Sequence, residues 1–133
     1  MIIIGDGGHA VVVREVIGRM DVILDDGWGF VAVGDNAARC REVEAHPELR
    51  WATLIDPSAV VSRSASVGPG TIIMAGVVVQ AGASIGQHVI LNTACTVDHD
   101  AVIGEYAHLA PGTHLCGAVV EGDGALVGVG SCE

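Results

Sequence analysis

The residues best suited to proton-transfer chemistry in this sequence are His99 and its neighbour Asp100. An imidazole titrates close to neutral pH, so it can take a proton from an attacking amine or hydroxyl group. A carboxylate beside the ring raises its basicity because it stabilises the protonated form. The alternative is a histidine that is merely solvated on a turn, and the choice between the two depends on where the fold places the pair.

A six-residue repeat predicts the elements that position this pair, and it runs from Ile55 to Cys132 without an insertion. One position of each unit is aliphatic, with a single interruption at Glu121: Ile55, Val61, Val67, Ile73, Val79, Ile85, Leu91, Val97, Ile103, Leu109, Leu115 and Val127. The residue four places after each of these is small or β-branched. This period fits neither a helix nor a long strand, but it fits short strands and turns that alternate along a parallel β-helix.

The ladder resembles the hexapeptide repeat of left-handed parallel β-helix acyltransferases. The resemblance implies the left-handed coil and three repeats per coil, whereas the general rule for parallel crossovers would favour the right hand. Residues eighteen apart then lie on the same edge of a three-sided column, about 4.8 Å from each other. His99 and Gly117 are eighteen apart and both fall at a bend, so we expect them on one edge.

The first 54 residues have a different pattern, in which strands and helices alternate. Strands are expected at residues 2–4, 22–24, 28–34 and 51–55, and helices at 10–20 and 37–45, the second capped by Asp35 or Asn36. This order predicts a small α/β domain with a parallel sheet over residues 1–54, followed by a β-helix domain over residues 55–133. The loop Gly5-Asp6-Gly7-Gly8-His9 departs from the GxGxxG fingerprint, so a dinucleotide site is disfavoured.

Four segments resemble the sugar acetyltransferases typified by the sialic-acid O-acetyltransferase family: Gly5 to His9, Leu24 to Asp26, Val33 to Asn36, and Leu91 to His108. The similarity is greatest to bacterial N-acetyltransferases of nucleotide-linked 4-amino-4,6-dideoxy sugars, of the bacillosamine-pathway and perosamine types. It implies a Rossmann-like N-terminal subdomain, acetyl-CoA as the acetyl donor, and a homotrimer whose active site lies between subunits.

The resemblance also implies roles for the acetyl-transfer residues. His99 would be the general base, with Asp100 supporting it, and the Gly117 N–H would bind the thioester oxygen. His108, on an outward strand face, and Val129, next to Gly128, would contact acetyl-CoA.

The nucleotide sugar is expected at the carboxyl ends of the N-terminal strands, where loop N–H groups suit a phosphate and carboxylates suit a ribose, base or amine. The residues implied are Gly8, His9, Asp25, Asp26 and Gly34. Asp25 and Asp26 could equally do no more than close a strand. His88 and His114 belong to no motif and are expected on the surface.

Charge and composition exclude several classes of partner. The net charge is −10 and all six basic residues are arginine, which argues against nucleic acid and anionic membranes. The four cysteines lack metal-ligand spacing, and no two of the repeat-region histidines have the five-residue spacing of the zinc-binding β-helical carbonic anhydrases, so no metal is expected. No long apolar run or basic leader occurs, which predicts a cytoplasmic protein without a membrane span.

Two other functions stay open at this point. A sugar O-acetyltransferase would use the same base, and a non-catalytic β-helical binding or assembly protein would need none.

The segment between Asp26 and Trp28 is shorter than in the family, and the sequence stops at Glu133, where relatives continue for about two coils. Trimer contacts are expected on a face with the apolar residues Ile72, Val78, Ile90, Val102 and Val120. The sequence does not identify the sugar or the nucleotide.

Overall fold

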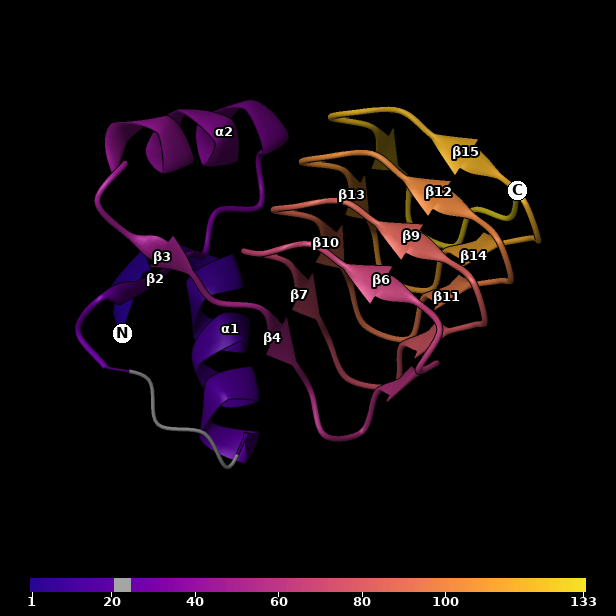
Figure 1. Cartoon of the computed structure of the whole chain (residues 1–133), viewed down its shortest axis with the longest axis horizontal. Coiled ribbons are helices and arrows are strands. Elements are labelled where there is room, and N and C mark those ends of the chain that lie inside the picture. The colour runs from indigo at the N-terminus through magenta and orange to yellow at the C-terminus, as the bar shows by residue number, and fades with distance from the viewer. Residues whose placement is uncertain (21–24) are drawn as a thin grey trace.

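The computed structural model describes residues 1–20 and 25–133, which form a small α/β part beside a column of short strands (Figure 1). The α/β part contains β1 (Ile2–Ile4), α1 (Gly8–Arg19), β2 (Trp28–Val31), α2 (Asn36–Ala45) and β3 (Arg50–Trp51). Its strands pair in parallel in the order β1, β2, β3. The parallel sheet expected for this region is therefore present, while the strand expected at residues 22–24 lies outside the described residues.

The boundaries of these elements follow from local hydrogen bonding. The Asp35 side chain accepts a hydrogen bond of 2.7 Å from the Ala38 N–H and so caps α2, as one of the two expected candidates. The single strand expected at residues 51–55 is wrong. It divides into β3 and β4 (Leu54–Ile55), which belong to different sheets because the chain leaves the α/β part between them.

The column is a parallel β-helix made of three sheets. The first face contains β4, β7 (Ile72–Ile73), β10 (Ile90–Leu91), β13 (His108–Leu109) and β16 (Leu126–Val127). The second contains β5 (Val60–Val61), β8 (Val78–Val79), β11 (Thr96–Val97) and β14 (His114–Leu115). The third contains β6 (Ser66–Val67), β9 (Ser84–Ile85), β12 (Val102–Ile103) and β15 (Val120–Glu121).

The register of these sheets confirms three repeats per coil. Along the first face Ile55 pairs with Ile73, and the pairing continues through Leu91 and Leu109 to Val127, each eighteen residues after the last. The aliphatic ladder and the small residues between its members point into the column and form one core. The inward alternation predicted from the repeat is confirmed.

The α/β part packs on the first face of the column. Ile72 and Ile90 are fully buried there, in a cluster with Val13 and Val16 of α1 and Phe30 of β2. The expectation that Ile72 and Ile90 are exposed for trimer contacts is therefore wrong.

The other residues expected at that surface lie on other faces of the column. Val78 is half-buried on the second face, whereas Val102 and Val120 are 41% and 71% exposed on the third.

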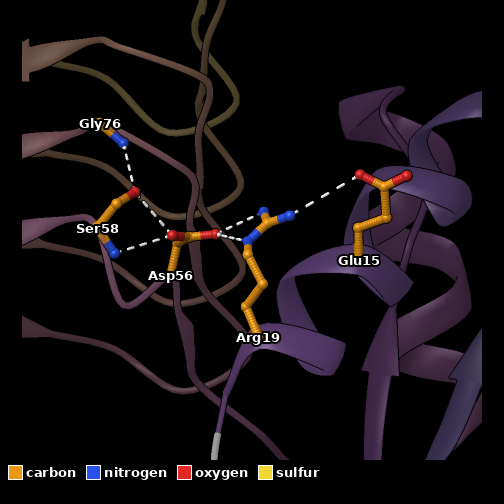
Figure 2. A network of polar contacts seen from close by, with 5 residues as sticks. All are labelled: Glu15, Arg19, Asp56, Ser58 and Gly76. Atoms are coloured by element: carbon orange, nitrogen blue, oxygen red, sulfur yellow. Dashed lines mark hydrogen bonds and ion pairs between the residues drawn. The ribbon is translucent and has the colours of Figure 1, made fainter.

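A polar network also joins the two parts, as Figure 2 shows. Arg19, the last residue of α1, donates to the buried Asp56 carboxylate, with 2.8 Å between its Nε and Oδ2. Asp56 also accepts from the N–H and hydroxyl of Ser58, and the Ser58 hydroxyl oxygen accepts from the Gly76 N–H in the next coil. This network fixes the end of α1 to the first two coils of the column.

Candidate active site

His99 and Asp100 occupy the bend between β11 and β12, on the edge that separates the second and third faces. The His99 N–H donates to the Asp98 side chain at 2.7 Å, and the ring Nδ1 lies 2.9 Å from Asp100 Oδ2. Both side chains of the pair are mostly exposed. The structure therefore places the predicted base and its carboxylate in direct contact, at a position open to a substrate.

The Asp100 contact defines the ring chemistry of His99. An ionised carboxylate only accepts, so Nδ1 carries the proton and Nε2 has the free lone pair. The hydrogen bond to Asp100 raises the pKa of His99 above its usual value, and the negative charge of Asp98 adds to the effect. His99 Nε2 is thus a basic nitrogen ready to accept a proton.

Gly117 lies directly beside this nitrogen, one coil further along the same edge. The Ala118 N–H donates to the His99 carbonyl at 2.9 Å, which confirms the expected eighteen-residue register. A Cβ on Gly117 would lie 2.6 Å from His99 Nε2, so the ring can occupy this place only because residue 117 has no side chain. Within the described part of the chain, the Gly117 N–H has no hydrogen-bond acceptor.

Gly82 supports Asp100 from the preceding coil in the same manner. A Cβ on Gly82 would lie 2.5 Å from Asp100 Oδ1, and Gly82 has a φ of +71°. Sequence reasoning missed this residue, although it stands eighteen places before Asp100 and could have been found from that spacing.

A hollow lies elsewhere, between the start of α2 and the edge that joins the third and first faces. Its volume is about 720 Å³. The residues that line it are Gly34, Asp35, Asn36, Ala37, Cys40, Glu105, Tyr106, His108, Asp123, Gly124 and Leu126. Of the predicted site residues, it brings Gly34 and His108 together. His99 lies one edge away in the same coil, across the strand β12.

His108 is half-buried and hydrogen-bonded through both ring nitrogens. Nδ1 lies 3.3 Å from the Gly34 carbonyl, and Nε2 lies 3.1 Å from Asn92 Nδ2. Burial lowers the pKa of His108 below its usual value. The structure therefore holds His108 as a neutral ring at the junction of the two parts.

His9 stands next to His108 at the first turn of α1, with 6.4 Å between the ring centroids. Burial, together with the charges of His108 and Arg39, lowers the pKa of His9 to about 4. Its buried Nε2 makes no hydrogen bond to any described residue. Gly8, which precedes it, is exposed and begins the helix.

The remaining predicted residues are not part of this arrangement. Asp25 accepts from the Gly27 N–H and pairs with Arg50 at 3.0 Å, and Asp26 is exposed next to it. Neither of these two carboxylates lines the cavity. Val129 is 78% exposed, on the last bend of the column.

The expectation that His88 is a surface residue is wrong, whereas His114 is exposed as expected. His88 is 2% exposed, stacked on Tyr106 with centroids 5.1 Å apart and in edge contact with Trp51 at 5.3 Å. Burial is the main reason that the pKa of His88 falls to about 4. The aromatic stack supports Tyr106 in the cavity wall, and the repeat alone gives no sign that this bend is covered.

Comparisons with known proteins show the family of the chain. No family model matches the chain. The UDP-N-acetylbacillosamine N-acetyltransferase of Bacillus subtilis (strain 168) is 38% identical over a match that covers 55% of this chain and 50% of that protein. The chain thus spans about half the length of this curated relative.

The acetyltransferase domain of PglB from Neisseria gonorrhoeae superposes with a TM-score of 0.91 at 34% identity, covering 98% of this chain and 80% of that domain. The chain belongs to the hexapeptide-repeat sugar N-acetyltransferase family.

Structures of two family members have been solved with ligands. The PglB domain in complex with acetyl coenzyme A has a TM-score of 0.89 at 33% identity, over 98% of this chain and 79% of that one. PerB from Caulobacter crescentus, in complex with CoA and GDP-perosamine, has a TM-score of 0.71 at 28% identity, over 99% of this chain and 90% of that one. Variants of the perosamine N-acetyltransferase with a histidine replaced by alanine or asparagine have been solved with the same two ligands.

The described helices of this family member, α1 and α2, are too short to cross a membrane.

Proposed function

We propose that this chain transfers the acetyl group of acetyl-CoA to the amino group of a nucleotide-linked 4-amino-4,6-dideoxy sugar. The observation that carries the proposal is the contact of His99 with Gly117 on one edge, with His99 Nδ1 held by Asp100 and Nε2 left free. The relatives support the substrates, since PglB binds acetyl coenzyme A and PerB binds CoA and GDP-perosamine.

The proposed reaction uses the two groups on this edge. The sugar amine attacks the thioester carbon, and its proton passes to His99 Nε2 as the new C–N bond forms. The Gly117 N–H donates to the thioester oxygen, on which negative charge develops in the tetrahedral intermediate. The C–S bond then breaks, and the CoA sulfur leaves with the proton from His99. Asp100 favours the protonated ring during the transfer and keeps the proton on Nδ1 throughout.

The binding residues of the proposal extend from this edge to the cavity. His108, Gly117 and Val129 are proposed contacts of acetyl-CoA. Gly8, His9 and Gly34 are proposed contacts of the nucleotide sugar, and the α/β part is proposed to be a Rossmann-like binding subdomain. Asp25 and Asp26 are further proposed contacts of the nucleotide sugar, whose carboxylates would accept hydrogen bonds from ribose hydroxyl groups or from N–H groups of the base.

A homotrimer would bring the two regions together, because His99 and the cavity lie on different edges of a single column. The exposed Val102 and Val120 give the third face, which separates those edges, an apolar surface suited to contact with a second copy. We propose that His99 of one subunit serves the cavity of its neighbour. We also propose a left-handed coil and a cytoplasmic location, as in the family resemblance.

Measurement of CoA release tests the proposal, with acetyl-CoA and a panel of UDP-linked and GDP-linked amino sugars as substrates. His99→Ala is expected to lower kcat by about 10² to 10⁴, the range for loss of a general base. His114→Ala is the matched control, since His114 is exposed on the second face and hydrogen-bonds Thr96. Equal turnover by the wild type and His99→Ala would remove His99 from the mechanism. Turnover of hydroxyl acceptors alone would favour O-acetylation, and intact trimers that bind no acetyl-CoA would favour an assembly role.

A further inference from the structure

Arg39 is a buried cation in α2 whose hydrogen-bond acceptors, among residues 1–20 and 25–133, include no carboxylate. It is 1% exposed. Its acceptors are the carbonyls of Val33, Gly34, His88, Tyr106 and Ala107 and the side-chain oxygen of Asn36. These contacts use all five N–H donors of the guanidinium. Burial lowers the pKa of Arg39 to about 10, so the side chain is still charged at neutral pH.

The acceptors come from both parts of the molecule. Val33 and Gly34 follow β2, whereas His88 and Tyr106 lie on successive coils, at the edge between the third and first faces. His88 and Tyr106 have φ values of +54° and +60°, and their carbonyls receive no backbone N–H among the described hydrogen bonds. Arg39 supplies the missing donors, because buried carbonyls need partners. It therefore holds the Gly34 loop at a fixed position against the column.

The Gly34 carbonyl passes this constraint on to His108. Arg39 NH1 donates to the Gly34 oxygen at 3.1 Å, and His108 Nδ1 lies 3.3 Å from the same oxygen. A carbonyl only accepts, so this contact requires a proton on Nδ1.

Asn92 fixes the other ring nitrogen independently. The Thr93 N–H donates to Asn92 Oδ1 at 2.8 Å, which identifies the group 3.1 Å from His108 Nε2 as the amide NH₂. This amide donates, so Nε2 must be the unprotonated nitrogen. Both ends of the chain of hydrogen bonds thus require the same tautomer.

We propose that Arg39 is a positioning residue, which fixes the Gly34 carbonyl and thereby holds His108 in the neutral Nδ1-protonated tautomer at the cavity. A protonated His108 would point an N–H at the Asn92 amide, so the arrangement opposes a positive charge on this ring. His108 then serves as a neutral contact for a bound ligand and takes no part in proton transfer. The link to ligand binding rests on the proposed function, whereas the tautomer does not.

The tautomer can be measured directly by NMR of ¹⁵N-histidine-labelled protein, with His108 assigned from a His108→Gln variant. In the wild type we expect a protonated Nδ1, an unprotonated Nε2 and a pKa of His108 below its usual value. Arg39→Met removes all five donors and releases the Gly34 carbonyl, so that Asn92 alone holds the ring, and we expect a mixture of the two tautomers. Arg39→Lys keeps the charge without the planar fork and is expected to give an intermediate result. If Arg39→Met does not fold, the wild-type and Arg39→Lys spectra still decide the question.

Arg19→Met is the matched control, because Arg19 also joins the α/β part to the column but does so through Asp56. It is expected to lower the thermal midpoint without changing the His108 spectrum.

In CoA-release assays, Arg39→Lys is expected to raise KM about tenfold while kcat changes less, as for a modest misplacement of a binding group. An Nε2-protonated His108 in the wild type, an unchanged spectrum in a folded Arg39 variant, or the same change in Arg19→Met would overturn the proposal. Loss of activity in every assay, with the expected spectra intact, would instead count against the proposed acetyl transfer.

Discussion

The imidazole of His99 rests on the α-carbon of Gly117, so that a methyl group at residue 117 would come within 2.6 Å of Nε2 and 2.7 Å of Cε1. The coils that stack the backbones of these two residues also place the ring against residue 117, which has no side chain. In the proposed mechanism, the nitrogen that takes the proton and the N–H that binds the thioester oxygen are consequently neighbours. The ring can occupy this place only because residue 117 is a glycine.

Gly117→Ala is expected to displace the His99 ring and to lower kcat by about 10², as for a misplacement of about 1 Å in a reacting group. The thermal midpoint should change little, because His99 is exposed and the ring can move into solvent. Gly122→Ala is the control, since a Cβ there meets nothing within 4 Å. Full activity in Gly117→Ala would show that the close approach has no catalytic importance.

Asp100→Asn is expected to move the acidic limb of the pH profile to lower pH. Asp100 raises the pKa of His99, and a general base works only in its neutral form, so activity falls as the pH drops through that pKa. The amide keeps an acceptor for Nδ1 but removes the charge, which returns the pKa toward about 6.5. The plateau rate should drop about tenfold, because a weaker base takes the proton less readily.

The measurement is kcat/KM from pH 5 to 9, beside Glu42→Gln, which removes one negative charge from α2, a helix that contacts a different edge of the column from that of His99. A shift of equal size in both variants would mean that net charge, and not the Asp100 contact, sets the pKa of the base.

The column and the edge that carries His99 could be predicted because the repeat constrains them twice. Each unit fixes which residues face inward, and the eighteen-residue coil fixes which bends are stacked. The register of His99 with Gly117 follows once three repeats per coil are taken from the family resemblance, and Gly82 beneath Asp100 would have followed as well.

What the sequence could not reveal is where the α/β part packs on the column. A strand of two consecutive apolar residues, such as Ile72-Ile73, has the same sequence pattern whether its outward-facing residue is exposed to solvent or packs in a cluster with Phe30. For the same reason His88 was expected on the surface and is buried between Trp51 and Tyr106. Arg39 was overlooked because a buried arginine that binds carbonyls leaves no paired acidic residue in the sequence.

The Asp56 network predicts how the two parts stay together. Burial by itself raises the pKa of Asp56, but the hydrogen bonds from Ser58 and Arg19 outweigh it and hold the pKa below its usual value. The stabilisation is therefore present above the unfolded-state pKa of about 3.9, and it is lost as the pH falls through the lower folded-state value. Asp56→Asn should lower stability at pH 7 by about 2 kcal/mol, the scale of charge-assisted hydrogen bonds.

Urea unfolding at one fixed protein concentration checks this at pH 7 and again near pH 3, where the difference between wild type and Asp56→Asn should shrink. Glu15→Gln is the control within the same network, because the Glu15–Arg19 pair is 3.8 Å long and exposed. A surface pair of this kind contributes at most about 0.5 kcal/mol. A constant difference between wild type and Asp56→Asn at both pH values would mean that shape, and not the ionised carboxylate, is what Asp56 contributes to the junction.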